Sequence, residues 1–204
     1  VKLEGNDLRY GEAEVEPDDT AAIIFTSGTT GTAKGVILSH GNITENVLGV
    51  SFNLTVHLDT MLSVLPLHHT YESTAGMLTA IYHGATVCFA ESLRKIVDNL
   101  VETKASVMLG VPALFEAIYR RIKAGIEEKG PRKFALAKGL AALSEKVLRI
   151  SIRRRLFAQV HNKVGGNLRM FISGGAAVSP EVSKGFRDLG IRSEEHTSEL
   201  QSRQ

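Results

Sequence analysis

The sequence has a single cysteine, no apolar run long enough to span a bilayer, and a net charge close to zero. Cys88 alone excludes a disulfide within the chain, and one free thiol suits a reducing compartment. A membrane-spanning helix needs about 20 consecutive apolar residues, and no stretch approaches that length. No secretory leader, internal repeat or low-complexity linker is visible either. These absences favour a globular protein of the cytoplasm.

The composition is that of a chain with a substantial core. Of the 204 residues, 43% are hydrophobic and 23% are charged, and the formal net charge is +2. The chain begins with Val1, and its first ordered segment is expected almost at once. We therefore expect residues 1–191 to be part of a domain from a longer protein.

The last thirteen residues differ in character from the rest. Residues 192–202 read RSEEHTSELQS, which resembles a sequencing adapter translated codon by codon. We expect the native sequence to stop near Ile191 and residues 192–204 to be a non-native tail. The alternative is a genuine polar tail, because charged, serine-rich ends are common.

Strand-like and helix-like segments alternate along the chain, which predicts an α/β fold with a largely parallel sheet flanked by helices. The predicted strands are nearly continuous apolar runs, as expected for burial on both faces: Ala22–Thr26, Val36–Leu38, Met61–Leu65, Ala85–Phe89, Val107–Leu109 and Leu168–Ile172. The predicted helices are Asn42–Leu54, Glu72–His83, Leu93–Thr103, Pro112–Lys129 and a last helix that opens at Ser179 and ends at Gly190.

Residues 26–35 read TSGTTGTAKG and directly follow an apolar strand-like run. Glycines in such a turn allow backbone N–H groups to approach a phosphate, the hydroxyls add donors, and Lys34 adds a positive charge. The segment therefore predicts a polyphosphate-binding loop, with an ordinary surface turn as the alternative. A Walker loop is disfavoured, because Ala33 and Gly35 replace the glycine and the hydroxyl residue that flank its lysine.

This segment resembles the phosphate loop of the adenylate-forming (AMP-binding) enzymes, whose pattern T-S-G-T-T-G-x-P-K-G it departs from only at Ala33. Two further segments are similar to the same family. Residues 65–72 read LPLHHTYE, and in the family the matching histidine, here His69, lines the boundary between the acyl and nucleotide pockets. The further Glu72 makes this segment resemble the long-chain acyl-CoA synthetase branch. Residues 173–179 read SGGAAVS, where the family contacts adenine through its backbone, with Ala177 in place of the usual proline. A helix-capping histidine pair and a tight turn without a ligand are the respective alternatives.

The resemblance implies part of the large N-terminal domain of a long-chain fatty-acid–CoA ligase, which uses ATP, Mg²⁺ and CoA to convert a fatty acid to acyl-AMP and then to acyl-CoA. It implies His69 and Lys34 as catalytic residues. It also implies that nucleotide-binding residues include Thr26, Ser27, Gly28, Thr29, Thr30, Gly31, Lys34, Gly174, Gly175 and Ala176. No metal ligand is expected in these residues. A ligase that loads a carrier protein, and a binding module without chemistry, are the alternatives.

The family continues beyond its SGGA segment with a Y-G-x-T-E motif, whose glutamate helps to hold magnesium, a ribose-binding aspartate and a terminal domain with a catalytic lysine. None of these occurs in the 204 residues. We therefore expect these residues alone to form no acyl-adenylate at a useful rate.

Residues 129–163 hold ten basic residues and one acid, Glu145, and apolar residues recur there at helical spacing: Leu140, Leu143, Val147, Ile150 and Phe157. One interpretation is a solvated basic face on two helices. The other is a contact with an anionic partner, either a membrane surface or a phosphate-bearing substrate. Nucleic acid is disfavoured, because few aromatic residues are interleaved with the charges.

Overall fold

The computed structural model describes residues 13–27, 33–53 and 60–196. The chain divides into two compact units, Val1–Leu54 and Thr55–Gln204.

The first unit contains a hairpin of β1 (Thr20–Ser27) and β2 (Ala33–Ser39), followed by α2 (His40–Asn53). The strands pair antiparallel, because the five residues between them are too few for a parallel crossover, which needs about a dozen. The prediction that Ala22–Thr26 forms a strand buried on both faces is wrong. Ile23 is 52% exposed and Phe25 is 74% exposed, since a two-stranded hairpin cannot cover both of its faces.

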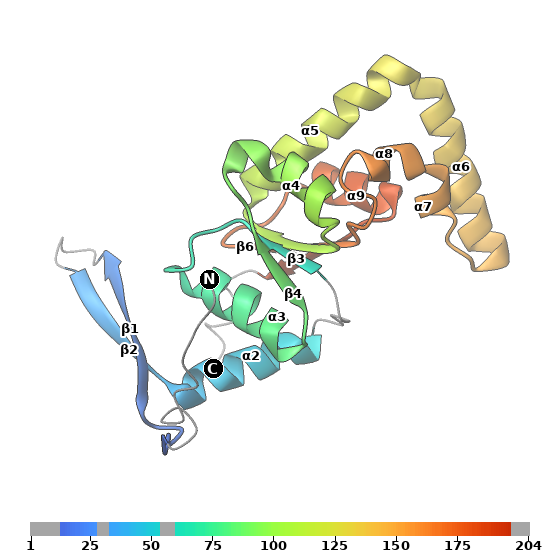
Figure 1. Ribbon diagram of the computed structural model, residues 1–204. Helices are drawn as coiled ribbons and strands as arrows, with labels where there is room; N and C mark the ends of the chain where they lie inside the picture. The colour runs from blue at the N-terminus through green and yellow to red at the C-terminus, as the bar shows by residue number, and fades with distance from the viewer. Residues whose placement is uncertain (1–12, 28–32, 54–59, 197–204) are drawn as a thin grey trace. The chain divides into compact units, whose positions relative to one another are not determined.

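The second unit contains a five-stranded sheet in the order β4-β3-β5-β6-β7, and all of its neighbouring strands are parallel (Figure 1). This confirms the predicted α/β class with a largely parallel sheet. The strands are β3 (Thr60–Ser63), β4 (Thr86–Phe89), β5 (Val107–Gly110), β6 (Met170–Gly174) and β7 (Arg192–His196).

Helices connect these strands. They are a π-helix η1 (Tyr71–Leu78), α3 (Thr79–Tyr82), a 3₁₀ turn η2 (Leu93–Lys95), α4 (Ile96–Thr103), α5 (Pro112–Lys129), α6 (Pro131–Leu148), α7 (Arg153–Leu156), α8 (Ala158–Asn162) and α9 (Pro180–Leu189). The predicted bounds of α5 are confirmed, as are both ends of α9. Ser179 Oγ accepts a hydrogen bond from the Val182 N–H, and Gly190 adopts φ of 83°.

The predicted helix Glu72–His83 is correct in place, but its first half is π-helical. The backbone N–H of Thr79 and its hydroxyl both donate to the carbonyl of Thr74, five residues earlier. The predicted second helix of the basic stretch is two short helices, α7 and α8, because the chain turns at Phe157.

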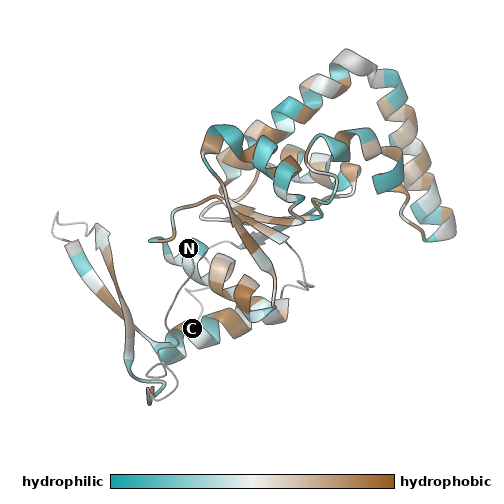
Figure 2. Ribbon diagram, in the orientation of Figure 1, coloured by the Kyte–Doolittle hydropathy of each residue, from teal (hydrophilic) through white to brown (hydrophobic). Residues whose placement is uncertain are grey.

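Alternate residues of the strands face two different helical layers, which is the period-2 rule of a strand. Leu62, Met108 and Phe171 belong to a core that includes Leu100 of α4 and Phe115 of α5. On the other face, η1 comes so close to β3 that a Cβ on Gly76 would lie 3.0 Å from Met61 Cε. The hydrophobic strands between these layers can be followed in Figure 2.

Strand β7 lies within the segment that the sequence suggests is non-native, and it pairs with β6 from Met170 opposite Arg192 to Gly174 opposite His196. A native boundary near Ile191 stays a prediction. Within the described part of the chain, no helix is sufficiently long and apolar to cross a membrane.

Candidate active site

Two turns of the second unit leave the same edge of the sheet. Strand β3 ends at Ser63 and leads to the segment that carries His69, whereas β6 ends at Gly174 and leads to Gly175 and Ala176. Because parallel strands share one carboxyl edge, both turns lie where open α/β sheets bind ligands.

The imidazole of His69 is held in one orientation by the backbone. Its Nδ1 accepts a hydrogen bond from the backbone N–H of Tyr71 at 3.2 Å, and the backbone N–H of His69 itself donates to the Pro66 carbonyl at 3.0 Å. The neutral ring therefore carries its proton on Nε2. Since His69 is exposed, its Nε2–H is a donor available to a carboxylate or phosphate oxygen.

Tyr71 joins the two turns. Its hydroxyl donates to the Ile172 carbonyl at 3.2 Å, across 101 positions of sequence. The ring lies directly on Gly174, where a Cβ would come within 2.4 Å of the ring carbons. Burial raises the pKa of Tyr71, and the neighbouring Glu72 carboxylate raises it further, so the hydroxyl stays a donor. Gly174 is therefore required for close packing between the turns.

The turn after Gly174 presents its backbone to solvent. Gly175 adopts φ of 82°, a conformation that favours glycine, and a Cβ there would meet no atom within 4 Å. Gly175 and Ala176 are exposed. A flat ring could lie against this backbone without a side chain in its way.

The carboxyl group of Glu72 lies near Ser63 at the end of β3, and the residue is fully buried. Neither of its oxygens has a hydrogen-bond partner within the described residues. Loss of water raises the pKa of Glu72, although the nearby Ser63 hydroxyl and the backbone N–H groups of Leu65 and Val64 act in the opposite direction. This acid is therefore held in an environment that favours its neutral form.

The predicted phosphate loop belongs to the first unit, and its described residues lie at the adjoining ends of β1 and β2. Thr26 is paired with Lys34 across the two strands, and the Thr26 hydroxyl donates to the Lys34 carbonyl at 3.5 Å. Both residues are exposed, and Ser27 forms the last position of β1. The predicted residues Gly28, Thr29, Thr30 and Gly31 lie outside the described residues.

The sequence prediction missed two residues of the site, Tyr71 and Glu72. The sequence predicted the glycines at 174 and 175 as access for adenine or as a tight turn without a ligand, and the structure adds that Gly174 makes room for the Tyr71 ring. A bulky aromatic residue two positions after His69 was the available signal. No pattern in the sequence indicated that the adjacent acid would be buried.

No metal site can be assigned in the described parts of the chain, since no three His, Cys, Asp or Glu side chains gather there. The buried Glu72 is a single carboxyl group near Ser63. The described residues therefore offer no set of protein ligands for Mg²⁺.

The family profile described as AMP-binding enzyme matches residues 3–197. Among curated proteins, the chain is 38% identical over 175 residues to peroxisomal long chain acyl-CoA synthetase 6 of Arabidopsis thaliana, covering 82% of this chain and 25% of that protein. It is 33% identical over 186 residues to long-chain-fatty-acid–CoA ligase 4 of Saccharomyces cerevisiae, covering 85% and 27% respectively. The chain thus spans about a quarter of the length of these curated relatives.

Solved structures share the fold. ATP-bound MatB from Rhodopseudomonas palustris superposes with a TM-score of 0.62 at 24% identity, over 91% of this chain and 30% of that one. The N-terminal domain of FACL13 from Mycobacterium tuberculosis gives a TM-score of 0.62 at 20% identity, over 90% and 37%. With nearly the whole chain matched by the family profile, the protein belongs to the AMP-binding enzymes.

Proposed function

We propose that the chain is part of an ATP-dependent ligase that converts a long-chain fatty acid to acyl-AMP and then to acyl-CoA. The observation that carries the proposal is the junction of the two turns through Tyr71, which brings the segment of His69 against Gly174. Relatives that bear the name of long-chain acyl-CoA synthetase or ligase support the choice of substrate.

The first chemical step joins a carboxylate to the α-phosphate of ATP. A carboxylate oxygen attacks phosphorus, the bond to the β-phosphate oxygen breaks, and pyrophosphate leaves. The Nε2–H of His69 donates to a carboxylate or α-phosphate oxygen and orients it for this attack. The backbone of Gly174, Gly175 and Ala176 lies against adenine.

The sequence motif of residues 26–34 binds the leaving pyrophosphate. Lys34 supplies a positive charge, Thr26, Ser27, Thr29 and Thr30 supply hydroxyl groups, and Gly28 and Gly31 supply backbone N–H groups. In the second step the thiol of CoA attacks the acyl carbon and AMP leaves. ATP and CoA are the proposed partners of the fatty acid, and Mg²⁺ is proposed with its main ligand in the Y-G-x-T-E motif beyond these 204 residues.

The test is ATP–pyrophosphate exchange by the full-length gene product in the presence of a long-chain fatty acid. His69→Ala should lower the exchange rate by on the order of 10²-fold, because the positioned donor is lost. His68→Ala is the matched control, since His68 is exposed and the described residues give it no hydrogen bond; it should leave the rate nearly unchanged. Equal loss in both variants would contradict the role of His69.

Two further measurements separate the alternatives. Transfer of the acyl group to a carrier protein rather than to CoA would identify a carrier-protein ligase. Binding of ATP without exchange by the full-length product would indicate a module that binds without chemistry. For the 204 residues alone we expect no exchange, and turnover by the purified chain would contradict this.

We place the enzyme in the cytoplasm, in peripheral contact with a membrane through residues 129–163. Support comes from the excess of basic residues in this stretch and from the poor solubility of long-chain fatty acids outside membranes. Nucleic acid has no part in the proposal.

A further inference from the structure

Helix α6 has two faces, and only one of them is covered. Ala141 and Ser144 are buried, and Phe134 and Ala137 pack partly against the core. The covered row anchors the helix to the second unit.

The second face carries large apolar side chains that remain exposed: Leu136 at 67%, Leu140 at 49%, Leu143 at 58% and Val147 at 66%. They follow one another at intervals of four, three and four residues. At 100° per residue, this row is centred roughly 110° from the covered row. Ile150, just beyond the helix, is exposed as well. The apolar stripe that the sequence predicted therefore faces solvent, with the exception of Phe157, which is buried.

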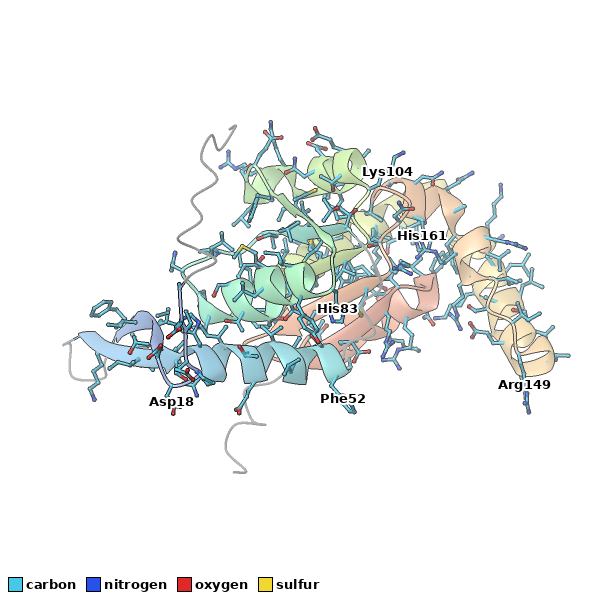
Figure 3. The ribbon with its side chains drawn as sticks, turned by 60° about the horizontal axis from the view of Figure 1, so that its bottom comes forward. Asp18, Phe52, His83, Lys104, Arg149 and His161 are labelled. Carbon is cyan, nitrogen blue, oxygen red and sulfur yellow. The ribbon has the colours of Figure 1, made fainter. Side chains whose placement is uncertain are left out.

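Basic residues flank the exposed row. Arg132 and Lys133 lie about 50° to either side of the centre of this row, and Lys146 lies on the same side of the row as Arg132. All three are exposed, and within the described residues none forms an ion pair. Arg149 ends the helix, and its side chain projects outward in Figure 3.

The other two charged residues of α6, Lys138 and Glu145, form ion pairs. Glu145 is bound by Arg153 Nε and Nη2, each at 2.7 Å, and Lys138 pairs with Asp188 of α9. The only acid of α6 is thus neutralised on the covered side. The outer face of α6, meaning Leu136, Leu140, Leu143 and Val147 with Arg132, Lys133 and Lys146, is apolar in the middle and positive at its borders.

We propose that the outer face of α6 lies in the interface of an anionic lipid bilayer, with its leucines among the acyl chains and its basic residues at the headgroups. A second copy of the chain fits this face less well, because pairing two such helices would bring their basic borders together. The inference deepens the membrane contact proposed above, by assigning it to one face of one helix. It does not depend on the ligase reaction.

Vesicle sedimentation of the 204-residue chain tests this proposal. The chain should sediment with vesicles of phosphatidylglycerol and phosphatidylcholine, and less with phosphatidylcholine alone or at high salt. Leu140→Gln with Val147→Gln should weaken binding by about tenfold or more, because two inserted side chains are lost. Arg132→Gln with Lys133→Gln should weaken binding to the anionic vesicles and reduce its dependence on salt.

The matched control is Ala135→Gln with Ala142→Gln, which adds polar groups to exposed positions of the same helix about 120° from the apolar row. It should bind as the parent chain does, and circular dichroism should show equal helix content in all variants. The same pairs in the full-length gene product should change the membrane-bound fraction in parallel.

Equal binding by the Leu140→Gln, Val147→Gln variant, or no sedimentation of the parent chain and the full-length product, would overturn the proposal. So would a dimer in solution that the same variant converts to a monomer, since the face would then contact a second copy. None of these measurements uses ATP or a fatty acid, so their failure is distinct from failure of the proposed ligase activity.

Discussion

The two faces of the five-stranded sheet are built from different chemistry, although they share the same strands. On one face Phe171 packs between Phe115 and Phe186, with ring centroids 4.7 Å and 4.4 Å away. On the other, η1 buries the Glu72 carboxyl close to Ser63. The aromatic face gains its free energy from apolar burial. On the polar face, the cost of burying the Glu72 carboxyl offsets part of the free energy gained from apolar burial. The same face positions the His69 turn.

This difference predicts opposite responses to substitution. Truncation on the aromatic face should destabilise the fold, whereas removal of the charge on the polar face should stabilise it. The four substitutions that follow test the contrast, from the largest expected effect to the smallest.

Phe171→Ala should lower the free energy of unfolding by about 3–5 kcal/mol, because it empties the centre of the aromatic cluster. Urea denaturation followed by circular dichroism measures the change. Phe89→Ala is the control, since Phe89 is 57% exposed on β4 and should have little effect. Similar losses in both variants would show that the aromatic face is not the main source of stability.

Gly174→Ala should destabilise by about 3 kcal/mol, the upper end for overpacking, because its Cβ would overlap the Tyr71 ring. Adding Tyr71→Ala should recover part of this loss, as a double-mutant cycle would show. The control Gly139→Ala has open space around its Cβ within α6, and it should stabilise slightly. A neutral Gly174→Ala would mean that the two turns are not tightly joined.

Glu72→Gln should raise the free energy of unfolding by about 1–2 kcal/mol near pH 8. Burial raises the pKa of Glu72 in the fold, so the folded chain binds its proton more tightly than the unfolded chain does. The contribution of Glu72 to the stability of the fold is therefore most favourable below the ordinary pKa of this carboxyl, 4.5. It is lost as the pH rises through the higher pKa that Glu72 has in the folded chain. The variant and parent should converge near pH 4.

Urea titrations at several pH values measure this difference. Glu102→Gln, at an exposed position of α4, is the control and should leave the free energy of unfolding nearly unchanged. A Glu72→Gln variant that is less stable than the parent at high pH would mean that a partner stabilises the carboxylate by more than its burial destabilises it.

Tyr71→Phe should destabilise by about 1 kcal/mol, because the Ile172 carbonyl loses its donor while the ring still covers Gly174. The exposed Tyr82 supplies the control, and Tyr82→Phe should be neutral in the same urea experiment. If both changes are neutral, the ring alone joins the two turns.

The sequence predicted the order and type of most elements because their apolar runs and end signals are local. Pro112, Ser179 and Gly190 mark helix ends through their own backbone or side-chain chemistry. The pairing of β1 with β2 was missed, although the short connection between them contained the necessary information. Strand β7 could not be expected from its charged sequence, since its position depends on backbone bonds to β6.

The candidate site was only partly predictable. The type of residue at His69 and Gly174 is visible in the sequence, but the packing of Tyr71 on Gly174 joins positions 103 apart and needs the folded sheet. The burial of Glu72 likewise depends on how closely η1 approaches β3. The outward direction of the α6 stripe depends on which side of the helix the core covers, and periodicity alone gives no sign of this.

The order of the strands has a consequence for handling the protein. Within the described residues, β4 and β7 are the outer strands of the sheet. Strand β7 carries Arg192 and Glu194, and charge on an edge discourages the addition of another strand. Strand β4 reads TVCF, without a charge and with Phe89 exposed. Aggregation at high concentration should therefore begin along β4, where a lysine in place of Thr86 would act as a gatekeeper.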